Sequence, residues 1–196
     1  MLLRCGTAPR CDNAANGEGR LRVKLRDLGW VWEGQGLDPG VDPSIFGVGE
    51  GAPYFGLTKA CYMFHPNNEL AMNKLAWLDE VVCDITKWKW RDSDKGGSEN
   101  WTDGAPETVR NEAANVSRLS CDFPNITGAY HDDMLGLIKR EHMTPEQFGE
   151  IYQALKSANP RLKLWPIVFT HGLKLKEWKG FEPFMDVISL WIWEAK

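Results

Sequence analysis

The acidic residues best placed for catalysis stand at the ends of apolar runs. Asp84 ends one such run, and the neighbours Asp132 and Asp133 end a second. Glu194 ends a third. Two carboxyl groups can act as a general acid and as a base or nucleophile, the pair that hydrolysis of a glycosidic bond usually requires. We predict that Asp132 or Asp133 supplies one catalytic carboxylate. The second would come from Asp84 or Glu194.

The adjacent acids Asp132 and Asp133 point to opposite faces if their strand continues through them. Asp132 then shares its face with Gly128 and Tyr130. We expect only one of the two acids to reach the site, while the other caps the following helix. Asp132 is preferred because the small Gly128 leaves room for a ligand beneath it.

Asp84 and Glu194 each allow a second interpretation. Asp84, inside a buried strand, is either a structural acid bonded to amides or a lysine, or an acid that orients substrate. Glu194 shares a face with the branched residues of its strand, and Trp191 and Trp193 share the other. Either face could be the inner one, and Glu194 could be a solvated terminal charge.

Two histidines, His65 and His171, also end predicted strands. Together with Asp84 and Asp132 they suggest an alternative, a metal-dependent hydrolase whose ligands come from several strands. No HxH or HExxH pair fixes two such ligands locally. The leading expectation therefore includes no bound metal and no cofactor.

Ten tryptophans are the most unusual feature of the composition. Several are spaced by two residues, which places both rings on one face of a strand. Sugar rings present apolar faces that stack on such aromatic surfaces, although any one tryptophan can equally belong to the core. The residues expected to contact a saccharide are Tyr130, His65, His171, Trp88, Trp191 and Trp193.

Five predicted strands position these residues, at 57–64, 80–87, 125–133, 162–170 and 186–193. Helices are expected between them at 69–78, 106–119, 134–139, 144–158 and 174–184. This alternation predicts an α/β fold with a parallel sheet and right-handed crossovers, either doubly wound or a barrel. A TIM-like (β/α)-barrel is favoured because acids or histidines end all five strands, and not only those at one switch point.

The remaining segments suggest one domain over residues 21–196, preceded by a disordered or loosely held stretch at 1–20. Glycines and prolines in 28–55 predict a long loop or an entry segment, and ordered loops of this length often cover a site. A complete barrel usually needs about 200 to 250 residues. We therefore expect an incomplete barrel of about five βα units, truncated at the C-terminus, or a sheet edge that something else covers. The third functional hypothesis is a non-catalytic barrel fragment that self-associates through this open edge.

Charge and composition exclude several other classes of protein. The net charge of −4 is spread along the chain, so no basic face is expected to bind nucleic acid. No run approaches the ~20 apolar residues of a membrane span, and no signal peptide is visible. The five cysteines have no CxxC spacing, which favours free thiols, a reducing compartment and, by default, the cytoplasm.

The strand ends also carry a resemblance to a known group. The runs CYMFHPN, VVCDITKW, ITGAYHDDM, WPIVFTH and DVISLWIW, with the helix start TPEQ, look like uncharacterised bacterial (β/α)-barrel proteins that are similar to glycoside hydrolases. The resemblance covers residues 56–193. It implies a TIM-barrel fold and a carbohydrate-related role, with Asp132 and Asp133 matching the acidic pair after the third strand.

Overall fold

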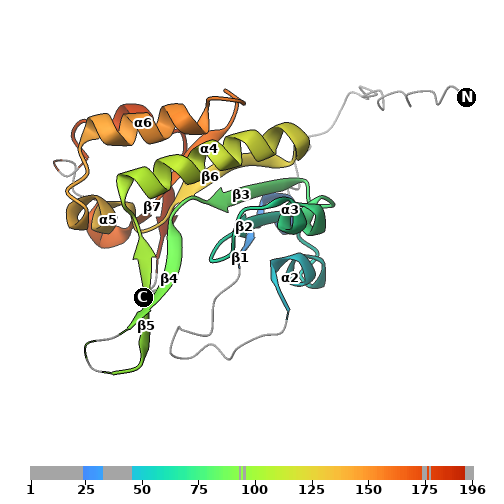
Figure 1. Cartoon of the computed structure of the whole chain (residues 1–196). Helices are drawn as coiled ribbons and strands as arrows, with labels where there is room; N and C mark the ends of the chain where they lie inside the picture. Colours follow the sequence, from blue (N-terminus) through green and yellow to red (C-terminus); the bar gives the residue numbers. More distant parts are fainter. Residues whose placement is uncertain are drawn as a thin grey trace, which may run out of the picture.

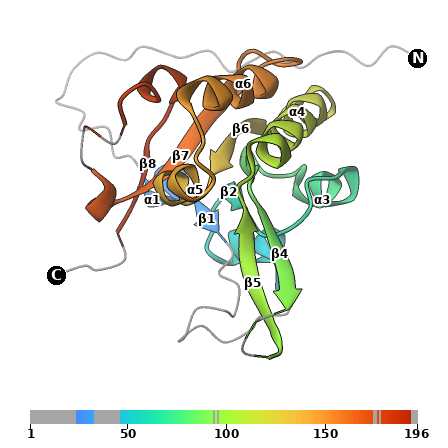
Figure 2. The same ribbon diagram turned by 60° about the vertical axis from the view of Figure 1, so that its left-hand side comes forward.

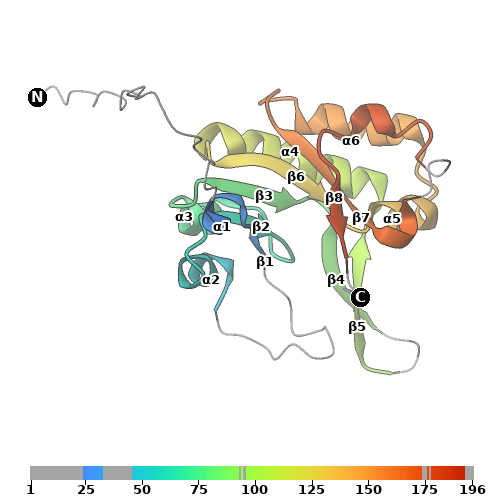
Figure 3. The same ribbon diagram turned by 180° about the vertical axis from the view of Figure 1, so that it is seen from behind.

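A single all-parallel sheet organises the protein. The computed structural model describes residues 24–32, 46–92, 94, 96–173, 176 and 178–192. Within them, six strands lie in the order β1-β2-β3-β6-β7-β8 and curl into a half-barrel (Figures 1 and 3). These strands are β1 (Val31–Trp32), β2 (Lys59–Tyr62), β3 (Glu80–Asp84), β6 (Ile126–His131), β7 (Lys163–Phe169) and β8 (Ser189–Trp191).

The strand order separates the two architectures that the sequence left open. Each strand pairs in parallel with the next parallel strand along the chain, so the sheet has no point at which the winding reverses. Right-handed crossovers in one direction place their helices on one face. A doubly wound sheet is therefore wrong, and the predicted parallel α/β fold with barrel-like winding is confirmed at this level.

The helices of the described part are α1 (Leu25–Leu28), α2 (Val48–Tyr54), α3 (Glu69–Leu75), α4 (Pro106–Asp122), α5 (Met134–Arg140) and α6 (Pro145–Leu155), with 3₁₀ turns η1 (Thr170–Gly172) and η3 (Glu182–Phe184). α2 to α6 pack on the convex face, and α3 to α6 begin where the sequence predicts, whereas α1 and α2 were not predicted. At α6 the Thr144 hydroxyl accepts from the Gln147 N–H at 3.3 Å, and the Thr144 N–H donates to the Gln147 side chain at 2.9 Å. This reciprocal cap fixes the start of the helix.

The segment 28–55, predicted as one long loop, instead contains a strand and a helix. β1 pairs with β2, with Val31 opposite Ala60, and forms one edge of the sheet. α2 follows, and its Gly47 N–H donates to the Glu50 carboxylate at 3.1 Å. A two-residue strand is too short to show a period, and the glycines around α2 resemble those of a loop. Residues 33–45 of this segment lie outside the described part, as does the whole stretch 1–20.

A second difference lies after β3. The strand predicted at 80–87 ends at Asp84, and the chain turns into an antiparallel hairpin of β4 (Lys87–Asp92) and β5 (Ser98–Asp103). The hairpin extends away from the sheet from the carboxyl end of β3 (Figure 2). Lys89 of β4 pairs with Asp103 of β5 within the hairpin, and Arg140 of α5 donates to the Thr102 carbonyl, which joins the base of the hairpin to the body of the fold.

Apolar side chains fill both faces of the sheet. The larger core lies between the sheet and the helices, with Phe148, Ile151 and Leu155 of α6 fully buried in it. The concave face carries no helix in the described part and is covered by side chains of the strands themselves. These are Cys61, Met63, Val82, Tyr130 and Ile167, with Trp30, Phe64, Trp165, Phe169 and Trp191 packed against them.

Two predictions about partners concern self-association through a sheet edge and insertion into a membrane. β1 and β8 are the edge strands of the described sheet, and Ile188, Leu190 and Ile192 are exposed along β8. Self-association through such an edge stays a prediction. No helix in the described ranges is long and apolar enough to cross a membrane.

The room predicted beneath Asp132 is occupied. A Cβ atom added to Gly128 would lie 2.5 Å from the Lys163 carbonyl oxygen and 2.9 Å from the Trp165 indole nitrogen. Gly128 therefore lets Trp165 lie against the strand, and it does not open space for a ligand. Asp132 is distinguished from Asp133 by its deeper burial, and not by room for a ligand beneath it.

Gly128→Ala should destabilise the protein by about 1 to 3 kcal/mol, because neither backbone nor indole can move away without disturbing β7. Gly136→Ala is the matched control: no atom lies within 4 Å of its added Cβ, and alanine favours the helix α5. Urea unfolding of both variants measures the difference. Equal stability of the two would contradict the close packing of Trp165 on Gly128.

Candidate functional site

Asp84 is held at the carboxyl end of β3 as a buried acid with one free oxygen. Its side chain is only 1% exposed. One carboxylate oxygen accepts from the Thr86 N–H at 2.9 Å and from the Thr86 hydroxyl at 2.7 Å, whereas the other has no hydrogen-bond partner among the described residues. Burial raises the pKa of Asp84 to about 6, against the lowering effects of Lys87 and Thr86. An acid of this kind is partly protonated near neutral pH.

Asp132 lies beside Asp84 on the concave face because of an irregularity in β6. The pairing of β3 with β6 shifts by one residue between Val81 and Val82, so that Asp84 is opposite Tyr130. A one-residue shift moves the following side chains to the other face. Ile126 consequently packs under the helices, whereas Tyr130 packs on the concave face. Asp132, two residues further on, follows Tyr130 to that face.

The two acids are close enough to influence each other. Asp132 is 6% exposed, and burial together with the charges of Asp84 and Asp133 raises its pKa well above the ordinary value. One of its oxygens accepts from the Asp133 N–H at 2.9 Å. Carboxyl groups that interact in this way titrate as a pair. The structure thus brings together two of the four predicted acids.

Asp133 occupies a different position, as the sequence expected for one member of the pair. It is the first residue of the turn into α5, with φ = 40°, but its side chain makes no capping hydrogen bond. It lines a cavity of about 300 Å³ together with His171. Burial raises the pKa of Asp133, while His171 and Arg140 lower it. Asp133 and His171 therefore face each other beside the site.

Aromatic rings form a continuous surface next to the two buried acids. The ring centroids of Trp32 and Trp191 are 5.0 Å apart, those of Trp32 and Phe64 6.2 Å, and those of Phe64 and Trp88 5.2 Å. We call Trp32, Phe64, Trp88 and Trp191 the aromatic wall. The Trp88 indole lowers the pKa of Asp132, which places the hairpin end of the wall beside that carboxyl group. The Trp88 N–H itself is buried without a well-aligned acceptor among the described residues.

The backbone at Phe64 is strained to place its ring in this wall. Its φ is 67°, a conformation in which bulky side chains are rarely found. Such strain is typical of functional sites, where surrounding contacts hold the residue in place. Phe64 lies two residues after the end of β2, so its ring extends the aromatic wall at the carboxyl ends of the strands.

The sequence left open which face of β8 is the inner one, and the structure places Trp191 on that face. Trp191 packs on the concave face, whereas Ile188, Leu190 and Ile192 are exposed on the other side. The predicted contact Trp193 and the predicted catalytic acid Glu194 lie outside the described residues. Of the two orientations that the sequence allowed for this strand, the structure has the one with Trp191 on the inner face.

His65 is not part of this cluster. Its ring lies 5.9 Å from that of Tyr62 and lines a separate cavity between α2 and α3. In the described ranges, no group of three or more His, Cys, Asp or Glu side chains could hold a metal ion. The four residues of the predicted metal site therefore do not assemble into one, because His65 lines a separate cavity and His171 lines another with Asp133.

Several residues of the site were not predicted. Trp32 belongs to no predicted strand, Phe64 breaks the alternation of its predicted strand, and Trp165 became part of the concave face only through the pairing of β6 with β7. The turn at Asp84 could have been predicted, because an Asp side chain often accepts from the backbone N–H two residues further on, here that of Thr86. The tryptophan spacing of two had indicated aromatic surfaces but not their position.

Comparison with known proteins adds no assignment: no family model matches the chain, and no curated protein or solved structure was found to be similar to it. The resemblance to glycoside-hydrolase-like barrels stays a prediction. Any functional inference depends on the two buried acids and the aromatic wall.

Asp84→Asn should stabilise the protein at pH 8. The folded pKa of about 6 exceeds the ordinary 3.8, so the folded protein binds more protons than the unfolded chain between these values. Stability is therefore lost as the pH rises through this window, by about 3 kcal/mol in all, and asparagine removes that loss. Thermal unfolding should show a higher Tm than wild type at pH 8 and no gain at pH 4.

Two features make this comparison specific to Asp84. His131, whose pKa is lowered to about 4 by burial, titrates equally in both proteins and cancels in the difference. Asp79→Asn, at an exposed position, is the matched control and should leave Tm unchanged at both pH values. A loss of stability in Asp84→Asn at pH 8 would mean that the carboxylate is a structural anchor.

Proposed function

We propose that this protein is a glycoside-hydrolase-like barrel protein that acts on a saccharide held against the aromatic wall. The observation that carries the proposal is that Asp84 and Asp132 lie at the carboxyl ends of the neighbouring strands β3 and β6, both buried and both with a raised pKa. Such a pair retains a proton at pH values where isolated aspartates have lost theirs. One member can then donate a proton while the other acts as base or nucleophile, as glycosidic hydrolysis requires.

The same proposal includes the type of barrel to which the sheet belongs. Six strands in sequential order have five connections between them, which supports a TIM-like (β/α)-barrel that is incomplete and has about five βα units. In such barrels the chemistry lies at the carboxyl ends of the strands. Asp84 ends β3, and Asp132 directly follows β6. This placement supports the assignment of the pair as the reacting groups.

The aromatic wall supports a saccharide as the ligand. Trp32 is 37% exposed, so part of its indole surface is open to a ligand, and Trp191, Phe64 and Trp88 continue the surface towards the acids. Aromatic faces bind the apolar faces of sugar rings, while polar groups nearby fix the hydroxyls. Asp133 and His171 are the polar side chains next to the pair that could do so.

Turnover of a glycoside should depend on both carboxyl groups. A panel of 4-nitrophenyl glycosides and oligosaccharides identifies the substrate, and Asp84→Asn and Asp132→Asn should each lower kcat/KM by about 100-fold or more. The exposed Asp79→Asn should retain full activity. Activity that survives both site substitutions, or no turnover and no binding across the panel, would contradict the proposal.

Binding should depend on the aromatic wall separately from catalysis. In the Asp132→Asn background, which prevents turnover, Trp32→Ala should weaken saccharide binding about 2- to 10-fold through loss of stacking. Trp77→Ala removes a tryptophan that is also exposed but lies beside α3, away from the wall, and should not change the affinity. Isothermal titration measures both. Equal effects of the two substitutions would place the saccharide elsewhere.

A further inference from the structure

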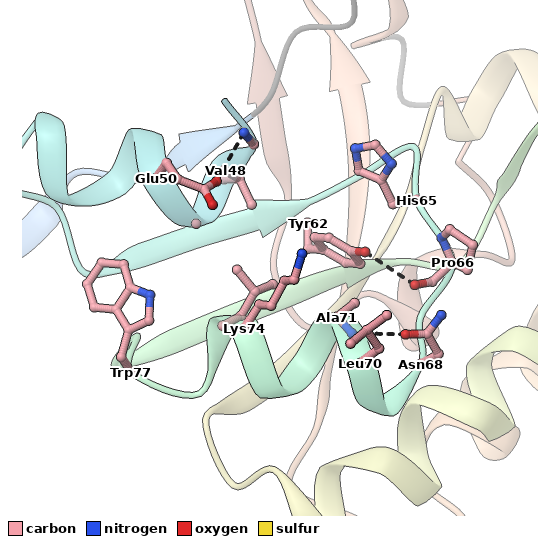
Figure 4. Close-up of a pocket in the computed structure, with 13 residues that line it drawn as sticks. Val48, Glu50, Tyr62, His65, Pro66, Asn68, Leu70, Ala71, Lys74 and Trp77 are labelled. Carbon is pink, nitrogen blue, oxygen red and sulfur yellow. Dashed lines mark hydrogen bonds between the residues drawn. The ribbon is translucent and has the colours of Figure 1, made fainter. Parts of the chain in front are cut away.

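A second cavity lies on the opposite face of the sheet from the aromatic wall. It has a volume of about 630 Å³ and is enclosed by the start of α2, the end of β2 and the exposed side of α3 (Figure 4). Side chains of a strand alternate between faces, and Tyr62 lines this cavity whereas Cys61 and Met63 pack on the concave face. The cavity is thus distinct from the proposed active site. Its volume is within the range of small-molecule sites.

The floor of this cavity is apolar and its rim carries exposed apolar groups. Val48, Tyr62 and Leu75 are buried at its base. At the rim, Trp77 is 46% exposed and Leu70 is 71% exposed. Two large apolar side chains left in solvent beside an apolar hollow favour a ligand with an apolar part.

The polar groups of the cavity favour a negative charge on that ligand. Lys74 forms no ion pair with any acid in the described part of the chain, and its side chain extends along the cavity towards Tyr62 (Figure 4). The acid of the cavity, Glu50, already accepts a hydrogen bond from the Gly47 N–H at 3.1 Å. His65 borders the far end, next to Pro66. Lysine binds phosphate and carboxylate as a point charge.

We propose that this cavity binds a small amphiphilic anion. Its apolar group would lie over Val48, Leu75 and the Trp77 ring, and its phosphate or carboxylate would be bound by Lys74, with His65 as a second polar contact. A bound metal does not fit, because Glu50 and His65 are the only metal-binding side chains that line the cavity as described. A neutral sugar would leave the ammonium group of Lys74 without a counter-charge.

The test uses three probes that share a phenyl ring and differ in the attached polar group: phenyl phosphate, phenylacetate and the uncharged benzyl alcohol. Isothermal titration of the whole protein should show binding of at least one of the two anions, and weaker binding of benzyl alcohol. Comparing the two anions distinguishes a phosphate from a carboxylate ligand. Raising the salt concentration should weaken the binding of the anions and leave the binding of benzyl alcohol unchanged.

Two substitutions address charge and volume independently. Lys74→Gln should weaken the binding of the anion about tenfold, because it removes a charge-assisted hydrogen bond, and should leave the binding of benzyl alcohol unchanged. Ala71→Leu, on α3, fills part of the cavity without changing its charge and should weaken the binding of all three probes. Lys179→Gln, at an exposed lysine outside the cavity, is the matched control and should bind all three as wild type does. Thermal unfolding confirms that each variant is folded.

The outcomes decide the proposal without reference to saccharide chemistry. Absence of anion binding by the wild type at millimolar concentration would overturn it, as would equal binding by Lys74→Gln and Lys179→Gln. Asp132→Asn should bind the anion as tightly as wild type, because the two sites lie on opposite faces of β2. Loss of anion binding in Asp132→Asn would show instead that the anion occupies the concave face.

Discussion

A parallel sheet whose connections all cross over one face has to cover its other face with side chains alone. In this protein the helices α3, α4 and α6 lie on the convex face, and the concave face is covered by rings. Trp30 packs edge-on against Trp165 at 5.3 Å, and Tyr130 meets the same indole at 5.9 Å. Aromatic side chains bury the most area per residue. Strands rich in tryptophan can therefore cover the concave face without a helix.

The same constraint determines how the acids behave. Asp84 and Asp132 lie above this aromatic layer, where few dipoles replace the water that an ionised carboxylate loses. Thr86 satisfies only one oxygen of Asp84, and the backbone of Asp133 bonds to one oxygen of Asp132. A fold selected for stability alone would hold an apolar or amide side chain at either position. Keeping two buried acids with raised pKa on one face is typical of a site that uses them.

How much of this site was predictable depends on whether a residue is placed by its own strand or by its neighbour. Asp84 and Asp132 could be predicted, because alternation along one strand fixes their face relative to Val82 and Tyr130. Trp165 could not, since its position over Gly128 depends on the register of β6 against β7. The bulge in β6 is equally invisible in the sequence, although it turns the acidic end of that strand to the concave face. The hairpin was missed because its polar composition resembles that of a loop.

The end of β2 connects the two proposed sites. Phe64 belongs to the aromatic wall, and the next residue, His65, lines the second cavity, so one peptide unit separates them. Strict alternation would send Phe64 to the face of Tyr62, but the positive φ of Phe64 breaks the alternation, and its ring packs on the concave face beside Met63. A ligand that repositions His65 would have to act on this strained turn.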